Sequence, residues 1–344
     1  MARKAASAKD VAELAGVSRA AVSRCFTPGA SLSPKTRERI LQAADQLGYQ
    51  VNRLASGLIR NETGIVALIA AEISTPYRSH LLSALTERLQ QAGKVALMIN
   101  TDRSDDSVEQ ALRHAISYRT DAAIFLSGMP ARSLAETCLR NGMRLVLINR
   151  DEERPGSLRL RLDDAEAGRR AVALLLAAGC KRLGLASSAA DTPSLTERER
   201  GFREAATAAG AEFIEERRGP TSYETGQELG MALLTQPNRP DGIFCTTDLM
   251  ACGIIDVARW RFGIAIPDDL SLIGFDDIAQ AGWEGYALTT FSQPIEEIAA
   301  KSVDWLISGE QKNEAEEVLL EPKLIMRRTV RQIYVSDTED RRQQ

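Results

Sequence analysis

Apolar residues recur at helical spacing near the N-terminus and predict two short amphipathic helices joined by a tight turn. Ser7, with Asp10 three residues later, is typical of a capping box that begins the first helix. Gly16 ends that helix, and Ser18 is placed to cap the second. The positions expected to face the core are Val11, Leu14 and Ala15 in the first helix and Ala21, Val22 and Cys25 in the second. This pattern indicates a helix-turn-helix whose second helix enters the DNA major groove, although an αα-hairpin inside a larger helical core would share it.

A third helix is predicted between Ser33, an N-cap followed by Pro34, and Gly48, which ends it. The positions expected on its apolar side are Ile40, Leu41, Ala44 and Leu47.

From Gly64 onwards the pattern changes, and short continuous apolar runs alternate with amphipathic segments. The predicted strands are 65–69, 95–99, 122–126, 145–148, 182–186, 212–216, 242–245, 270–273, 288–292, 318–320 and 323–326. The predicted helices include 108–117, 165–178 and 295–308, with others beginning near 76, 195, 223 and 248. Continuous apolar runs are typical of strands covered on both faces, so the pattern predicts an α/β core with parallel sheets.

Charge is unevenly distributed along the 344 residues, whose formal net charge is −4. Residues 1–60 contain ten Lys and Arg against four Asp and Glu, whereas the remainder contains 33 against 43. A basic head on an acidic body suits a nucleic-acid-binding unit with a separate control domain. The five cysteines have no CxxC spacing, which fits reduced intracellular thiols. No apolar run approaches the roughly 20 residues of a membrane helix, and the N-terminus lacks the apolar stretch of a signal peptide. We therefore expect a cytoplasmic, nucleoid-associated protein.

No sequence pattern typical of catalysis is present. His80 and His114 lie in predicted helices without metal-ligand spacing, and there is neither a P-loop nor a GxSxG motif. The acidic pairs Asp163-Asp164 and Asp276-Asp277 can bind Mg²⁺, but at strand ends such residues are more often helix caps or polyol ligands. We therefore expect no enzyme, no catalytic residue, no metal and no cofactor.

Polar residues follow several predicted strands, and a small polar molecule is the ligand that they suit best. They are Glu72, Asn149, Arg150, Thr247, Asp248 and Asp276. Ligands of open α/β sheets bind at the carboxyl ends of strands. Asp and Asn pair well with vicinal hydroxyls, and Arg donates in a planar fork, so a sugar or polyol is favoured.

The motifs of the head resemble those of one known family. They are Asp10-Val11-Ala12, Ala15-Gly16-Val17-Ser18, Val22-Ser23-Arg24, Thr36-Arg37-Glu38-Arg39, Leu47-Gly48-Tyr49 and Asn52-(x2)-Ala55-(x2)-Leu58. In order and spacing they resemble the lactose-repressor/galactose-repressor (LacI/GalR) family of bacterial transcription regulators, and the resemblance continues to about residue 330. It implies a type I periplasmic-binding-protein-like core of two subdomains, between which the chain would cross near 162, 291 and 324.

The resemblance also implies the domain organisation. A helix-turn-helix domain would occupy 1–50, a hinge helix or linker 51–62, and an effector-binding and dimerisation domain 63–334, followed by a polar tail, 335–344. The N-terminal subdomain would comprise about 63–162 and 292–323, and the C-terminal subdomain about 163–291 and 324–334.

For the head, the resemblance implies DNA contacts. Base contacts fall to Arg19, Ala20 and Arg24, and phosphate contacts to Ser18, Ser23, Ser33, Thr36, Tyr49 and Asn52. In the family a leucine from each of two paired hinge helices inserts into the minor groove, and Leu58 is the matching position, with Ala55 on the same hinge. Val51, where proline is common, and Gly57 make this hinge less pre-organised, so a flexible linker is the alternative.

For the core, the resemblance implies an effector site. Arg198 matches the effector-contacting arginine of the family, Asp276 matches its acidic ligand, and Asn149-Arg150 replaces the usual Asp-Arg pair. The full predicted set is Glu72, Tyr77, Asn149, Arg150, Arg198, Tyr223, Thr247 and Asp276, with the two tyrosines as aromatic walls. Asn149 in place of Asp removes a negative charge from the cleft, which suits an acidic sugar derivative.

The sequence therefore predicts a transcription regulator, a repressor of LacI type, that binds a palindromic double-stranded DNA operator as a homodimer. A sugar or sugar acid would control it from a cleft between two α/β subdomains. One alternative is a binding module of the periplasmic solute-receptor type, which the basic head and the missing signal peptide disfavour. The other is an enzyme on the same fold, which the lack of an activated nucleophile disfavours.

Overall fold

The computed structural model describes residues 6–27, 29–51, 62–102, 104–126, 132–150, 154–308 and 315–332. These residues form two compact units, one that ends at Gly64 and one that begins at Ile65. The predicted hinge residues Asn52, Ala55 and Leu58, and the predicted polar tail, lie outside the described residues.

The first unit, the head, consists of three helices: α1 (Ala8–Ala15), α2 (Arg19–Cys25) and α3 (Pro34–Leu47). Ser7 and Asp10 form the predicted capping box, because the Ser7 backbone N–H donates to Asp10 Oδ2 at 2.8 Å and the Asp10 N–H donates to Ser7 Oγ at 3.4 Å. Gly16 and Gly48 end α1 and α3 in the left-handed conformation, with φ of 61° and 62°. Local capping signals therefore determine where the helices begin and end.

The core of the head differs from the predicted one at three leucines. Leu14, Leu41 and Leu47 are 51%, 47% and 38% exposed and do not belong to it. The buried side chains are Val11, Ala12, Ala15, Ala21, Val22, Cys25, Ile40, Ala43 and Ala44. Five of these nine are alanine, so the three helices approach closely and the larger leucines remain at the flanks. In the buried core of this small unit, alanines therefore occupy the space that the leucines were predicted to fill.

The second unit, the core, contains two six-stranded sheets. The first has the order β11-β5-β4-β3-β1-β2 and the second the order β12-β10-β9-β8-β6-β7. The strands of the first are β1 (Ile65–Ala70), β2 (Val95–Asn100), β3 (Ala122–Phe125), β4 (Arg144–Ile148), β5 (Ser157–Leu162) and β11 (Glu316–Leu320). Those of the second are β6 (Arg182–Ser188), β7 (Glu212–Arg218), β8 (Gly242–Cys245), β9 (Ser271–Asp276), β10 (Thr289–Ser292) and β12 (Lys323–Ile325). All pairs are parallel except that of β10 with β12, which is antiparallel.

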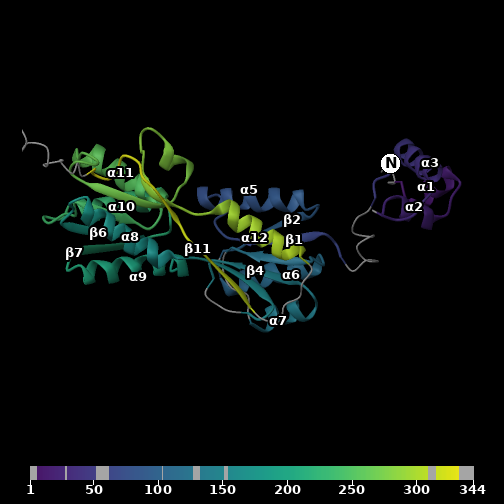
Figure 1. The fold of residues 1–344 in the computed structure, drawn as a ribbon, viewed down its shortest axis with the longest axis horizontal. Helices are drawn as coiled ribbons and strands as arrows, with labels where there is room; N and C mark the ends of the chain where they lie inside the picture. The colour runs from purple at the N-terminus through teal and green to yellow at the C-terminus, as the bar shows by residue number, and fades with distance from the viewer. Residues whose placement is uncertain are drawn as a thin grey trace, which may run out of the picture. The chain divides into compact units, whose positions relative to one another are not determined.

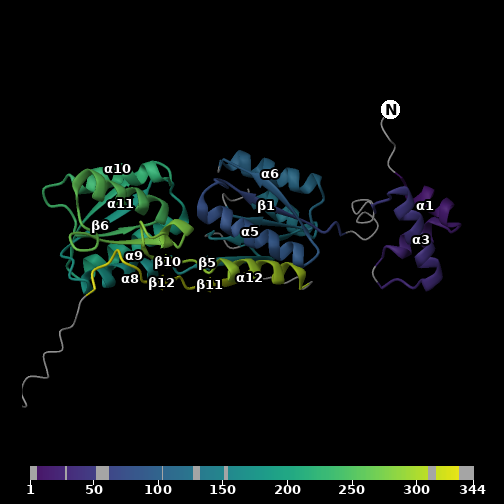
Figure 2. The same ribbon diagram turned by 90° about the horizontal axis from the view of Figure 1, so that it is seen from above.

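Each sheet has its own helices, and the predicted fold class of two parallel-sheet α/β subdomains is confirmed. The N-terminal subdomain has α5 (Pro76–Gln91), α6 (Asp105–Ser117), α7 (Arg132–Arg140) and α12 (Ile295–Ile307). The C-terminal subdomain has α8 (Asp164–Ala177), α9 (Pro193–Ala208), α10 (Tyr223–Leu234), α11 (Asp248–Phe262) and the 3₁₀ helix η1 (Ala279–Gly282). Figures 1 and 2 show α12, which comes late in the chain, lying beside α5.

The chain passes between the subdomains at three places: from β5 to α8, from β10 to α12, and from β11 to β12. Strand β5 is absent from the sequence-predicted set, which goes from 145–148 directly to a helix at 165. Its leucines at 158, 160 and 162 are buried and alternate with Arg159 and Arg161. Arg159 is opposite Glu317 of β11 in the strand register and forms an ion pair with it. A partner carboxylate on the neighbouring strand therefore allows an arginine inside this sheet.

Candidate functional site

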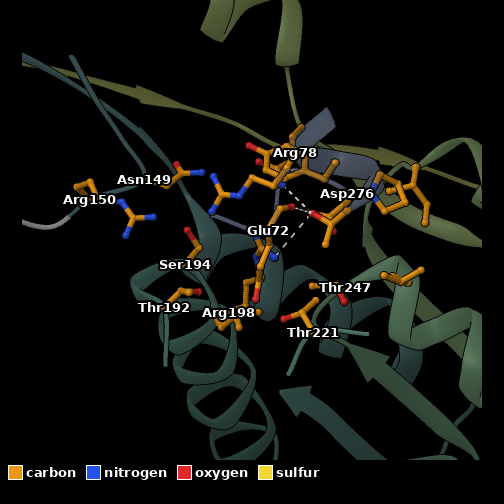
Figure 3. A pocket seen from close by; sticks show the side chains of 17 residues that line it. Glu72, Arg78, Asn149, Arg150, Thr192, Ser194, Arg198, Thr221, Thr247 and Asp276 are labelled. Carbon is orange, nitrogen blue, oxygen red and sulfur yellow. Dashed lines mark hydrogen bonds and ion pairs between the residues drawn. The ribbon is translucent and has the colours of Figure 1, made fainter. Parts of the chain in front are cut away.

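The carboxyl ends of strands from both sheets border a cleft of about 700 Å³, counting the space open to solvent (Figure 3). Of the eight predicted effector-binding residues, seven line it: Glu72, Tyr77, Asn149, Arg150, Arg198, Thr247 and Asp276. The first four belong to the N-terminal subdomain and the other three to the C-terminal one. A ligand bound here would touch both subdomains.

Three of these residues have a backbone conformation that favours glycine. Glu72, Asn149 and Asp276 have φ of 53°, 54° and 123°. Each lies at the carboxyl end of a strand, β1, β4 or β9. Such conformations cost roughly 1–3 kcal/mol each for residues with a side chain, and they concentrate at functional sites. The strain points to a site in the cleft, because the three residues come from different strands but face one space.

Arg198 is the most deeply held charge of the cleft, with 3% of its surface exposed. Its Nε donates to Asp164 Oδ1 at 2.8 Å, and its Nη1 donates to the Thr246 carbonyl at 2.8 Å. The guanidinium lies 3.4 Å from the centroid of the Phe275 ring, and Nη1 is 3.9 Å from Asp276 Oδ1. Arg198 is thus fixed in position between two carboxylates.

The close packing of α8 on α9 brings Arg198 to Asp164. At Gly201, one turn after Arg198, an added Cβ would lie 1.9 Å from the Ala165 carbonyl oxygen. Only glycine allows this approach, which explains Gly201 near the predicted effector arginine. Asp164 was not among the predicted site residues.

Asp276 has a second partner that the sequence analysis missed. Gln293 donates from Nε2 to Asp276 Oδ1 at 2.6 Å, and both side chains line the cleft. Burial raises the pKa of Asp276 to about 6, against the opposing effects of the Arg198 charge and the Gln293 hydrogen bond. Gln293 lies between β10 and α12, where the chain returns to the N-terminal subdomain.

Buried polar atoms without a hydrogen-bond partner gather on the same cleft. They are the Tyr77 hydroxyl, Thr247 Oγ1 and Gln293 Oε1. Thr247 and Gln293 are only 6% and 5% exposed. Leaving such atoms unsatisfied costs about 1–3 kcal/mol each, so three on one surface indicate a place that polar groups of a ligand or water occupy.

Tyr223, the eighth predicted effector residue, does not line the cleft. It begins α10 directly after the N-cap Ser222, and the helix directs its hydroxyl to Asp256 Oδ2 at 2.7 Å. This hydrogen bond raises the pKa of Tyr223 to about 12. Thr221, two residues earlier, lines the cleft instead. The prediction of Tyr223 as a wall of the cleft is therefore corrected.

Asp248 supports the site from within the fold. It is fully buried, and it accepts hydrogen bonds from Thr290 Oγ1 at 2.6 Å and from the Ile278 N–H at 3.0 Å. Burial, followed by the charge of Asp276, raises the pKa of Asp248 to about 8. Asp248 ties β10 and the loop after β9 to α11, and it is not among the residues that line the cleft.

The acidic pairs considered for metal binding have other partners. Asp163 caps α8 by accepting from the Glu166 N–H, Asp164 binds Arg198, and Asp277 forms an ion pair with Arg327 at 2.6 Å. Within the described residues, no group of three or more His, Cys, Asp or Glu is arranged to hold a metal ion. No helix of the described part is both long and apolar enough to cross a bilayer.

The predicted base-contacting residues Arg19, Ala20 and Arg24 are all exposed on α2. Among the predicted phosphate contacts, Ser18 and Ser33 also cap helices, since Ser18 Oγ accepts from the Ala21 N–H and Ser33 Oγ from the Thr36 N–H, both at 3.2 Å. The remaining predicted contacts in the described part are Ser23, which is exposed, and Thr36 and Tyr49, which are partly exposed.

Two basic residues of the head bind the ends of its helices. Arg37 donates from Nη1 to the carbonyl of Cys25, the last residue of α2, at 2.6 Å. Arg39 donates to the carbonyl of Ala15, the last residue of α1. Cations at helix C-termini satisfy carbonyls that have no partner within the helix. Part of the basic charge of the head is therefore structural.

Comparison with known proteins matches both units. Residues 7–52 match the family model of bacterial regulatory proteins of the lacI family, and residues 172–330 match that of the periplasmic binding protein-like domain. The HTH-type transcriptional regulator DegA of Bacillus subtilis (strain 168) is 31% identical over 326 residues, which cover 92% of this chain and 96% of DegA.

Solved structures agree with this match. The Lac repressor dimer bound to operator and the anti-inducer ONPF has a TM-score of 0.85 at 24% identity, over 96% of this chain and 100% of that one. The transcriptional regulator CelR in complex with cellobiose has a TM-score of 0.67 at 26% identity, over 94% and 99%.

A three-helix DNA-binding head and a core of two α/β subdomains define a DNA-binding transcriptional regulator. The chain belongs to the LacI family of bacterial regulatory proteins. The sequence-based predictions of the family and of a regulator that is not an enzyme are confirmed.

Proposed function

We propose that this regulator is a repressor that binds a palindromic operator as a homodimer in the cytoplasm, and that a sugar or sugar derivative in the cleft controls it. The observation that carries the effector proposal is the gathering of Tyr77 Oη, Thr247 Oγ1 and Gln293 Oε1, all buried without partners, on a cleft bordered by strained strand ends. Hydroxyls of a polyol can donate to or accept from each of these atoms.

The head supports the DNA part of the proposal. Arg19 and Arg24 are exposed on α2, where each could donate to guanine O6 and N7, and Ala20 could contact a thymine methyl. One such module buries too little surface for tight binding, and a two-fold dimer can bind both halves of a palindrome. The Lac repressor of similar fold is a dimer bound to operator.

The cleft supports control by a sugar through its two walls. A ligand that contacts Tyr77 and Asp276 together favours one arrangement of the subdomains, and only such a differential contact can change DNA affinity. The similar regulator CelR was solved with cellobiose. The hinge residues Ala55 and Leu58 would transmit the change, with Leu58 entering the minor groove.

The test combines a thermal-shift screen of sugars and their derivatives with operator affinity measured by fluorescence anisotropy. A ligand of the folded protein raises the melting temperature and should change operator affinity. Asp276→Asn should abolish this response and leave operator affinity without effector close to that of the parent. Asp268→Asn, an exposed acid of the same subdomain, is the control and should respond like the parent. A full response of Asp276→Asn would contradict the effector site.

A further inference from the structure

Aromatic side chains gather at the surface of the C-terminal subdomain, away from the residues that line the cleft. Trp260, near the end of α11, is 80% exposed and is the most exposed large apolar side chain of the described residues. Trp283, just after η1, is 57% exposed, and Tyr223 and Tyr286 are partly exposed. Single exposed apolar residues are common on proteins, but tryptophan and tyrosine that gather together are typical of protein–protein interfaces.

The two tyrosines meet on one carboxylate. Tyr223 begins α10, Tyr286 lies in the loop before β10, and both phenols donate to Asp256 Oδ2, at 2.7 Å and 2.9 Å. Helices α10 and α11 lie side by side, which brings Tyr223 to Asp256 (Figures 1 and 2). Within the described part of the chain, Asp256 has no cationic partner. The tyrosines therefore position a partly exposed carboxylate without neutralising its charge.

Arg259 follows Asp256 on the same helix, at the i+3 spacing that makes side chains neighbours. Its Nη1 donates to the Gly285 carbonyl, in the loop that also contains Tyr286. Among the residues that the structure describes, Arg259 pairs with no acid. One helix therefore carries, one turn apart, an unneutralised acid and an unneutralised base, both partly exposed.

The tryptophans adjoin these charges. Trp260 is four residues after Asp256 and thus one turn from it on α11, and the Trp283 carbonyl accepts from the Tyr286 N–H at 2.9 Å. The surface that these side chains form is called the α11 face. Its members are Tyr223, Asp256, Arg259, Trp260, Trp283 and Tyr286.

The charges of the α11 face are self-complementary about a two-fold axis. When a helix packs against its own copy in antiparallel orientation, each residue i faces the partner's residue j, and each j faces the partner's i. With the axis between Asp256 and Arg259, both carboxylates would meet a guanidinium at once. A second copy supplies these two charges by symmetry, whereas an unrelated protein would need its own acid and base at matching positions.

We propose that the α11 face binds a second copy of this chain, with Asp256 of each subunit paired to the partner's Arg259 and with Trp260 and Trp283 buried around the two pairs. The pairing rests on the proposed homodimer and names the surface and the charges that select its partner. The tyrosines act as positioning residues, because they hold the carboxylate that the partner's guanidinium would bind.

Charge reversal tests the pair and requires neither the effector nor the operator. The full-length parent should sediment as a dimer, and its tryptophan emission should shift to shorter wavelength as the concentration rises, because two of its three tryptophans become buried. Asp256→Arg and Arg259→Asp each place two pairs of like charge in the dimer. Each variant should therefore raise the Kd of dimerisation at least about a hundredfold.

Restoration of the dimer is the decisive measurement. An equal mixture of Asp256→Arg with Arg259→Asp should form a heterodimer, because every pair across the axis again has opposite charges. The double variant should likewise dimerise with itself. Arg261→Asp, which reverses an exposed charge of the same helix, is the control and should dimerise like the parent. Arg259 makes only one hydrogen bond, so Arg259→Asp remains informative if Asp256→Arg does not fold.

Two results would overturn the proposal in different ways. If the parent is a dimer and either variant dimerises as tightly, or if the mixture of the two stays monomeric, the homodimer stands and the α11 face is not its interface. If the parent is monomeric at every concentration tested, both the interface and the proposed homodimer are wrong.

Discussion

On α2 of the head, the side chains proposed to contact DNA bases are exposed, whereas in the cleft the side chains proposed to contact the effector are largely buried. Arg19 and Arg24 project from a helix that packs on a core of nine buried side chains, five of them alanine. Arg198 and Asp276 belong to the buried network that joins α8, α9 and β9. Residues of the first kind can change without affecting folding, but those of the second kind carry both stability and recognition. Substitutions on α2 should therefore change binding without changing stability, whereas substitutions in the cleft should change both.

The largest expected effect is on the stability of Arg198→Ala. Removing this guanidinium leaves Asp164 buried without its partner, beside Asp276, and loss of one member of a buried pair costs about 3–5 kcal/mol. The free energy of unfolding of the core should fall by this amount in urea titrations. Tryptophan fluorescence reports on the core alone, because the three tryptophans are Trp260, Trp283 and Trp305.

The control for this prediction lies two residues away on the same helix. Arg200 is 46% exposed at its side chain and pairs with Glu197 and Glu204 at the surface. Arg200→Ala should cost less than about 1 kcal/mol, because surface ion pairs contribute little. Equal losses of unfolding free energy in Arg198→Ala and Arg200→Ala would show that a buried ion pair of the cleft contributes no more to stability than one at the surface.

The second prediction concerns pH. The pKa of Asp248 is raised to about 8, from about 3.9 in the unfolded chain, so the folded protein binds its proton more tightly. The resulting stability is complete below about pH 4 and is lost as pH rises towards 8. The pKa of Asp276 is raised only to about 6, so this residue contributes only at the lower end of the range. The fall in stability between pH 6 and 8 should therefore come mainly from Asp248.

Asp248→Asn tests this directly, because an amide resembles the neutral acid: it can accept from the Ile278 N–H and donate to the Thr290 hydroxyl. Urea unfolding at pH 6, 7 and 8 should show a steep decline for the parent and a shallow one for the variant. Asp268→Asn, at the surface, should decline like the parent. If the stability of Asp248→Asn declined as steeply as that of the parent, ionisation of Asp248 could not be the cause of the decline.

Sequence alone predicts a feature of either region well when the residues that determine it are close together in the chain, and poorly when they are brought together only by the tertiary fold. In the head, Ser7, Ser18 and Gly16 act within one turn, so the helix limits were predictable. The exposure of Leu14 was not, because the core face of an eight-residue helix depends on how closely its neighbours pack.

In the core, the rule that ligands bind at strand ends located Glu72, Asn149 and Asp276, since each directly follows or ends an apolar run. It missed Gln293, which lies between β10 and α12 and lines the cleft. It also missed Asp164, the first residue of α8, which does not line the cleft but binds Arg198. The expected crossings near 162 and 291 were the signal that could have located both. The prediction placed Tyr223 in the cleft, but Tyr223 is the first residue of α10, and from that position its hydroxyl reaches Asp256 instead.

A smaller effect is expected for Arg19→Ala, and it falls on specificity. Arg19 is exposed and its loss should leave the stability of the head unchanged. Binding-site selection should show relaxed preference at one base pair in each half-site, by about 1–3 kcal/mol. Arg39→Ala should behave in the opposite way: its contact with the Ala15 carbonyl holds α1, so its loss should weaken binding to all sequences alike. An unchanged selection profile for Arg19→Ala would remove it from the base contacts.

The smallest effect distinguishes two serines, the N-cap of α2 and one within α2, that are both predicted to contact phosphate. Ser18 Oγ accepts from the Ala21 N–H as the N-cap, whereas Ser23 is exposed in the middle of the helix. Loss of an N-cap costs about 1 kcal/mol, so Ser18→Ala should speed amide hydrogen exchange in Arg19–Cys25 about fivefold. Ser23→Ala should leave exchange unchanged.

Both serine variants should weaken DNA binding equally across sequences, because phosphates carry no base information. Hydrogen exchange and binding-site selection together therefore distinguish the Ser18 hydroxyl, which caps the helix and would contact DNA, from the Ser23 hydroxyl, which would contact DNA alone. Faster exchange in Ser23→Ala, or altered base preference in either variant, would mean that even on this exposed face stability and recognition are coupled. The head would then resemble the cleft, and the contrast between the two regions would be one of degree.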